Sequence, residues 1–237
     1  MYRNPLCVLA GLALAVLVIP DIAAAQRDDS PPPAKPAEKL VYADFENAEN
    51  GKAVSARGGA VTVSSYQESD VHKTTVKGAP NAADSPELVH VKPGDPNHLA
   101  KIEFGFMSPN NWAGATIEIK GQPDVDGKSP AEDVNAYKKI TFQLYATGAE
   151  TVRLQAISRG SAADNQVAWP QMHFKVRPGL NTYEVALKSL IWPGWVDTKD
   201  DPKKTLSKLT ALSITAFCEP CRPTQGIMIL DNVVFEK

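Results

Sequence analysis

The chain has 237 residues, of which 22% are charged, and its formal net charge at pH 7 is −2. It has no run of basic residues and no interleaving of basic with aromatic residues, so it lacks the electrostatic footprint of a nucleic-acid-binding protein. The length is sufficient for a hydrophobic core that needs no disulfide staples.

The first 25 residues have the pattern of a secretion signal. Arg3 is the only charge before an apolar run over 6–19, and small residues follow at 23–25. The run is shorter than the roughly 20 apolar residues of a membrane span, and Pro20 ends it. We therefore expect a cleaved signal peptide over 1–25, a periplasmic or extracellular location, and no membrane insertion after cleavage.

The next segment, 26–39, is charged and rich in proline and shows no hydrophobic periodicity. This composition predicts an extended, flexible tether. The remaining residues, 40–237, have the length of one domain.

Within that domain the hydrophobic pattern has a period of two. Three runs, 139–145, 151–156 and 172–176, alternate clearly and predict half-buried strands. Further strands are expected at 40–46, 60–66, 87–91, 99–106, 115–120, 183–187, 211–217 and 227–235, with Gly, Pro, Asn and Asp between them. The only helical segment expected is a short turn within 202–209. Many short strands in one domain predict an all-β fold, an antiparallel β-sandwich or jelly roll.

Alternation also separates the two faces of the strands. The side chains expected in the core are Ile140, Phe142, Leu144, Val152, Leu154, Phe174 and Val176. Those expected to point outward are Thr141, Gln143, Tyr145, Arg153, Gln155, His173 and Lys175. Planar hydrogen-bonding groups of this kind suit the vicinal hydroxyls of sugars, although a solvated sheet face would have the same pattern. If the Val152 strand pairs with the Ile140 strand, Gln143, Tyr145, Arg153 and Gln155 become cross-strand neighbours.

The four tryptophans divide into two groups. Trp169, Trp192 and Trp195 lie in loops beside proline, where a rigidly held indole can stack on a sugar ring or plug the open end of a sandwich. Trp112 is expected to pack in the core or at a corner.

Cys218 and Cys221 are spaced C-x-x-C. No helix follows them and an exported protein meets an oxidising compartment, so the spacing favours a structural disulfide over a redox site. A single C-x-x-C without a second pair is also a poor zinc site.

Several short segments resemble the galactose-binding-like jelly-roll modules, which include secreted carbohydrate-binding modules and relatives of the complex I intermediate-associated protein. The segments are 44–46, 112–114, the strand pair ending in Arg153, 178–185 and 229–235. The resemblance spans 40–237 and implies a structural calcium ion held by Asp44, Glu46 and Asp231. Calcium takes six to eight oxygen ligands, so backbone carbonyls would have to complete the site. The alternative is that these acids are solvated near strand ends.

Gln171 and His173 match a Gln-x-His pattern of some jelly-roll alginate lyases, in which Gln neutralises a uronate and His accepts a proton. The other motifs of those enzymes are not visible here, and no G-x-S-x-G nucleophile motif is present. We therefore assign no catalytic residue.

Three hypotheses about function follow from these features. The first is a secreted, non-catalytic carbohydrate-binding protein whose partner is a glycan, bound by Gln143, Tyr145, Arg153, Gln155, Trp169, His173, Trp192 and Trp195. The second is a polysaccharide lyase or glycoside hydrolase on the same fold. The third is a structural or assembly domain that binds another protein.

Overall fold

The computed structural model describes residues 38–68, 74–76, 79–80, 84–107, 111–123, 125, 130–159, 168–197 and 201–237. The expected signal peptide and most of the expected tether lie outside these residues. Helical structure in the described ranges is limited to a 3₁₀ turn, Leu187–Ser189, and the short helix α1 (Lys203–Leu206). No helix in these ranges is long and apolar enough to cross a membrane.

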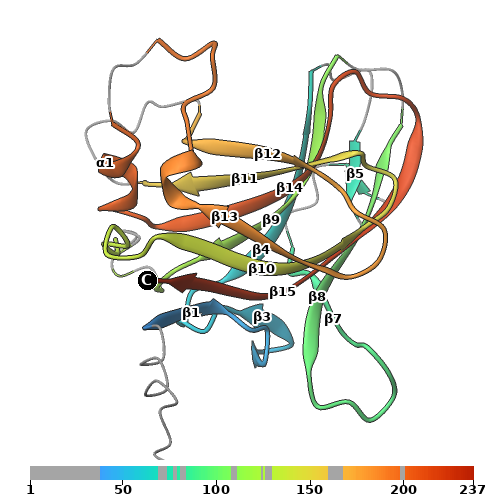
Figure 1. Cartoon of the computed structure of the whole chain (residues 1–237). Helices are drawn as coiled ribbons and strands as arrows, with labels where there is room; N and C mark the ends of the chain where they lie inside the picture. Colours follow the sequence, from blue (N-terminus) through green and yellow to red (C-terminus); the bar gives the residue numbers. More distant parts are fainter. Residues whose placement is uncertain are drawn as a thin grey trace, which may run out of the picture. The chain divides into compact units, whose positions relative to one another are not determined.

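Two antiparallel sheets form the domain (Figure 1). The larger has the order β13 (Asn181–Ala186), β10 (Lys139–Ala146), β15 (Thr224–Glu236), β8 (His98–Phe106), β5 (Thr74–Val76) and β6 (Ala79–Pro80). In the same sheet β1 (Lys39–Ala43) pairs with β15, and β7 (Glu87–His90) pairs with β8. The smaller has the order β12 (Gln171–Lys175), β11 (Thr151–Ile157), β14 (Ala211–Cys218), β9 (Ala113–Lys120) and β4 (Val61–Gln67). Strands β2 (Asn47–Glu49) and β3 (Lys52–Val54) form a separate hairpin.

The strand order is that of a jelly roll, which confirms the predicted fold class. Strands β8, β15, β10 and β13 are neighbours in one sheet, and β9, β14, β11 and β12 are neighbours in the other, so most neighbours are distant in sequence. The first and last strands, β1 and β15, pair with each other. Each expected strand overlaps an observed one, whereas β2, β3, β5 and β6 were not predicted, because two or three residues are too few to show a period of two.

The core lies between the two sheets and is formed by alternate side chains, as predicted. Phe142 and Leu144 of β10 and Val152 and Leu154 of β11 are all at most 1% exposed. Phe142 reaches across to the smaller sheet, where its ring centroid lies 5.6 Å from that of Phe174. The two sheets are therefore held against each other by apolar burial.

One predicted pairing is wrong. Strands β10 and β11 do not pair: β10 lies between β13 and β15, and β11 lies between β12 and β14. The chain passes from one sheet to the other after Ala146, so the outward faces of the two strands are on opposite sides of the domain. Alternation could not reveal this, because a strand shows the same period of two in either sheet.

Candidate functional site

The outer face of the smaller sheet has a cleft of about 750 Å³. Its floor is formed by side chains of β4, β9, β14, β11 and β12, and its rim includes Trp112, Trp169 and Trp195. This volume lies in the range of pockets that hold small molecules, so the cleft is the candidate binding site.

Strand register arranges the outward side chains of this sheet in rows. One row consists of Thr62, Glu118, Ser213, Gln155 and Gln171. The adjacent row consists of Ser64, Thr116, Thr215, Arg153 and His173. A third consists of Tyr66, Gly114, Phe217, Thr151 and Lys175. Hydroxyl, amide and aromatic groups from five strands thus lie side by side on one surface.

The amide row is ordered by its own hydrogen bonds. Gln155 Nε2 donates to Gln171 Oε1 at 2.9 Å, and Ser213 Oγ donates to Gln155 Oε1 at 3.2 Å. Both glutamines line the cleft. Because an amide can make several hydrogen bonds, this row retains donors and acceptors for a ligand while its geometry is fixed.

The adjacent row centres on Arg153. Its Nη2 donates to the Tyr66 hydroxyl, and its guanidinium carbon lies 5.3 Å and 5.0 Å from the ring centroids of Tyr66 and Phe217. Burial lowers the pKa of Arg153 and raises the pKa of Tyr66. The cation is therefore held between two aromatic rings, which stabilise it by cation–π attraction.

Gly114 makes this arrangement possible. A Cβ atom at this position would lie 2.4 Å from Tyr66 Cζ and 2.5 Å from its hydroxyl oxygen. The Tyr66 ring therefore lies over the backbone of β9, in space that only glycine leaves open.

A second arginine in the cleft is neutralised. Arg159 Nη1 and Nη2 donate to Glu118 Oε1 and Oε2 at 2.6 and 2.7 Å. This is the bidentate geometry that favours arginine–carboxylate pairs. Glu118 and Arg159 thus contribute a fixed polar surface with little net charge.

Tryptophan side chains stand around the rim. Trp112 is 40% exposed and Trp195 is 67% exposed, while Trp169 is half-buried. The ring centroid of Trp112 lies 5.8 Å from that of Tyr66. Large exposed rings around a polar floor leave apolar faces available to a ligand.

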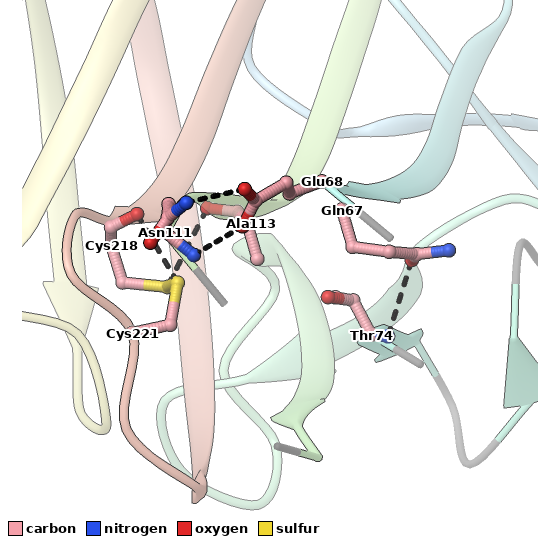
Figure 2. The surroundings of a disulfide bond; sticks show 7 residues. All are labelled: Gln67, Glu68, Thr74, Asn111, Ala113, Cys218 and Cys221. Atoms are coloured by element: carbon pink, nitrogen blue, oxygen red, sulfur yellow. Dashed lines mark hydrogen bonds between the residues drawn. A yellow bond between two sulfur atoms is a disulfide. The ribbon is translucent and has the colours of Figure 1, made fainter. Parts of the chain in front are cut away.

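Contacts between residues distant in sequence hold the residues on both sides of Trp112. Figure 2 shows Asn111 bonded to Glu68 on one side and Ala113 beside the Cys218–Cys221 disulfide on the other. The Glu68 carboxylate accepts hydrogen bonds from the backbone and side-chain nitrogens of Asn111, and Glu68 N donates to Trp112 O at 3.2 Å. The predicted disulfide between Cys218 and Cys221 is present, and it follows Phe217 at the end of β14. Cys218 pairs in register with Ala113, the residue after Trp112.

The structure brings together some of the predicted site residues and separates others. Arg153, Gln155, Trp169 and Trp195 line the cleft. His173 is at the end of the Arg153 row, with its ring centroid 5.1 Å from that of Phe217, but it is not part of the lining. Trp192 is not part of the lining either.

Gln143 and Tyr145 lie on β10 in the larger sheet, so the expectation that they neighbour Arg153 and Gln155 is wrong. Trp112 was expected in the core or at a corner; it does not lie in the core but at the rim, where it is 40% exposed. Tyr66, Ser213 and Phe217 belong to the cleft but were not predicted as site residues. Their strands were predicted, but only the register shows that they lie beside Arg153.

The expected calcium ligands are already engaged by N–H donors. Asp231 is 1% exposed and accepts hydrogen bonds from Asn97 Nδ2, Asn232 N and Asn232 Nδ2. Glu46 Oε1 accepts from His98 N at 2.8 Å, and Glu46 Oε2 lies 3.2 Å from His98 Nδ1. Among the described residues no group of three or more His, Cys, Asp or Glu side chains is placed to hold a metal. Calcium binding by Asp44, Glu46 and Asp231 therefore stays a prediction, which melting curves with chelator and with excess calcium would test.

The fold and cleft define a jelly-roll β-sandwich with an open cleft on one sheet. No protein-family model and no curated protein matches the chain. Among solved structures it is similar to the family 11 carbohydrate-binding module of the cellulosomal cellulase Lic26A-Cel5E of Clostridium thermocellum. The TM-score is 0.48 and the identity 14%, over 85% of this chain and 95% of that chain.

It is also similar to the family 30 carbohydrate-binding module of the cellulosomal cellulase Cel9D-Cel44B of the same organism. Here the TM-score is 0.44 and the identity 11%, over 73% of this chain and 91% of that chain. An exo-β-agarase has a TM-score of 0.44 and 12% identity, over 84% of this chain and 25% of that chain. Because these likenesses are distant, the function of the cleft is derived from its own residues.

Proposed function

We propose that this chain is a glycan-binding protein and that an oligosaccharide lies in the cleft of the smaller sheet. The observation that carries the proposal is the combination of three tryptophans at the rim, Trp112, Trp169 and Trp195, with an ordered floor of amides and hydroxyls. Sugar rings have apolar C–H faces and hydroxyl-bearing edges, so they need both kinds of group at once.

The floor and the rim would act on different parts of the sugar. Gln155, Gln171 and Ser213 offer donors and acceptors whose orientation is set before the ligand arrives, which reduces the entropy lost on binding. The indoles offer broad, rigid surfaces for stacking.

A structural or assembly domain that binds another protein fits the cleft less well. A protein-binding domain would be expected to present a large apolar patch, whereas this surface is concave and its floor combines polar with aromatic side chains. The geometry therefore favours a small, hydroxyl-rich ligand.

Calorimetric titration with a panel of neutral and acidic oligosaccharides tests the proposal. A β-1,3-1,4-mixed-linked tetrasaccharide is a useful neutral probe, because a family 11 carbohydrate-binding module was solved with this sugar. We expect Gln155→Ala and Gln171→Ala each to weaken binding by about 1 kcal/mol, roughly fivefold. Gln143→Ala on the other sheet is the matched control and should bind like the wild type. Absence of binding to every glycan would overturn the proposal.

A second candidate is cleavage of an acidic glycan by β-elimination. It is favoured by one observation: Arg153 donates to the Tyr66 hydroxyl and is in register with His173, at the edge of the cleft. In such a reaction a base removes the C5 proton of a uronate, the C4–O bond breaks, a C4=C5 double bond forms, and the departing oxygen takes up a proton from water. Burial and the charge of Arg153 lower the pKa of His173, which keeps it in the neutral form that a base requires. Formation of unsaturated products would support cleavage. Glycan that stays intact after long incubation would refute cleavage, and binding would then be the only function proposed for the cleft.

We further propose that the protein is exported, through removal of residues 1–25. N-terminal sequencing of the secreted protein tests this, and a start at Gln26 is expected.

A further inference from the structure

The arginines of the described chain differ in how their charge is balanced. Arg57 pairs with Glu132 at 2.9 Å, and Arg159 pairs with Glu118 at 2.6 Å. Arg153 forms no ion pair with any carboxylate in the described part of the chain, although it is partly buried at the floor of the cleft.

Among the described residues, Tyr66 is the only hydrogen-bond partner of the Arg153 guanidinium. The Arg153 Nε atom is buried and has no partner there. A guanidinium has five N–H donors and normally satisfies several of them. Leaving a partly buried cation without a counter-charge costs free energy, and burial correspondingly lowers the pKa of Arg153.

The surrounding groups do not supply the missing charge. Glu219 lies at the rim, but its side chain is exposed, and water and salt screen its effect on the floor. Lys175 and His173 lie on the neighbouring strand and can only add positive charge. The floor around Arg153 is therefore suited to an anion.

We infer that Arg153 receives an anionic group of the bound sugar, a carboxylate or a sulfate, so that the cleft selects acidic polysaccharides over neutral ones. This inference rests on the proposed glycan-binding function. Carboxylate and sulfate share the geometry of two oxygens that accept parallel bonds from one guanidinium.

The first experiment uses the unchanged protein. Its affinity is measured for an oligomer of uronic acid, for the same oligomer with methyl-esterified carboxylates, for a sulfated galactan oligomer and for a neutral glucan oligomer. We expect the acidic form to bind roughly 10- to 100-fold more tightly than its ester, because a hydrogen bond to a charged group is lost. The sulfated oligomer shows whether sulfate can replace carboxylate, and a preference for it over the glucan would also support the inference.

The second experiment assigns the preference to Arg153. Arg153→Gln should abolish the difference between acid and ester, and Arg153→Lys should keep part of it, because lysine retains the charge without the planar fork. Arg177→Gln removes one charge from an exposed arginine that stacks on Tyr183 outside the cleft, and should leave the preference unchanged.

The outcomes separate this inference from the proposed function. Equal affinity for the acid, its ester, the sulfated galactan and the neutral glucan would overturn the inference and leave glycan binding intact. A preference that survives in a folded Arg153→Gln protein would also overturn it. Failure to bind any of the oligomers would refute both. If Arg153→Gln does not fold, the acid–ester comparison on the wild type and the Arg153→Lys variant still decide.

Discussion

The two outer faces of the sandwich have the same alternating polar pattern in the sequence but different organisation in the structure. On the larger sheet, charged side chains neutralise one another. Lys139 Nζ lies 2.7 Å from Glu184 and 3.3 Å from Glu236, and Lys101 Nζ lies 2.7 Å from Glu103. On the smaller sheet, amides, hydroxyls and rings line a cleft, and Arg153 has no acidic partner among the described residues.

This difference shows what makes an outward face suitable for binding. Cross-strand ion pairs on an exposed face contribute little stability, and they use the groups that a ligand would need. The smaller sheet instead keeps unused hydrogen-bonding capacity behind a rim of tryptophans. Polar alternation alone therefore does not identify a binding face.

The largest effect is expected from the rim. Simultaneous replacement of Trp112 and Trp195 by alanine should weaken glycan binding by about 3 kcal/mol, roughly 100-fold, because two stacking surfaces are lost. Both side chains are exposed, so stability should change little. Tyr145→Ala on the larger sheet is the control; if it reduced affinity as much, the contrast between the two faces would be refuted. Calorimetric titration measures both variants.

A smaller effect is expected from Gly114→Ala. The new methyl group must displace the Tyr66 ring, which should lower the free energy of unfolding by about 1–3 kcal/mol and break the contact with Arg153. Gly194→Ala is the matched control, since a Cβ there meets nothing within 4 Å. Chemical unfolding compares the two, and equal stability would show that Tyr66 is not fixed over β9.

The disulfide should contribute up to about 2 kcal/mol, because it closes a very short loop. Replacing Cys218 and Cys221 by serine should lower the melting temperature and loosen the cleft rim at Glu219, while the larger sheet keeps its structure. Hydrogen exchange followed residue by residue would locate the change. Uniform loss of protection over both sheets would contradict a local role.

The smallest effect concerns pH. The pKa of His173 is lowered by burial and by Arg153, so the folded state disfavours its protonated form. Stability should therefore fall as the pH drops from about 6.5, the usual histidine value, toward the folded-state pKa. The stability contributed by the ion pairs of the larger sheet should fall only at lower pH, because pairing with lysines lowers the pKa values of Glu103 and Glu236. Urea unfolding of the wild type and of His173→Gln, at neutral and at mildly acidic pH, measures this loss of stability. If the free energy of unfolding fell equally with pH in both proteins, His173 would not be the cause.

Local sequence patterns were sufficient to predict the all-β sandwich, the inward and outward side chains of the strands over 139–145, 151–156 and 172–176, and the Cys218–Cys221 disulfide. Period-two alternation and a four-residue spacing are properties of a few consecutive residues, so they can be recognised without knowing the fold.

Only the tertiary structure decided which outward residues share a surface. Arg153 bonds to Tyr66, 87 positions away, and Glu68 holds Asn111 beside Trp112 from 43 positions away. Gln143 and Gln155 have the same strand pattern, but one lies on each side of the domain. Alternation sets the face of a side chain relative to its own strand, whereas the jelly-roll crossing between sheets determines where that face lies, and this crossing depends on packing over the whole chain.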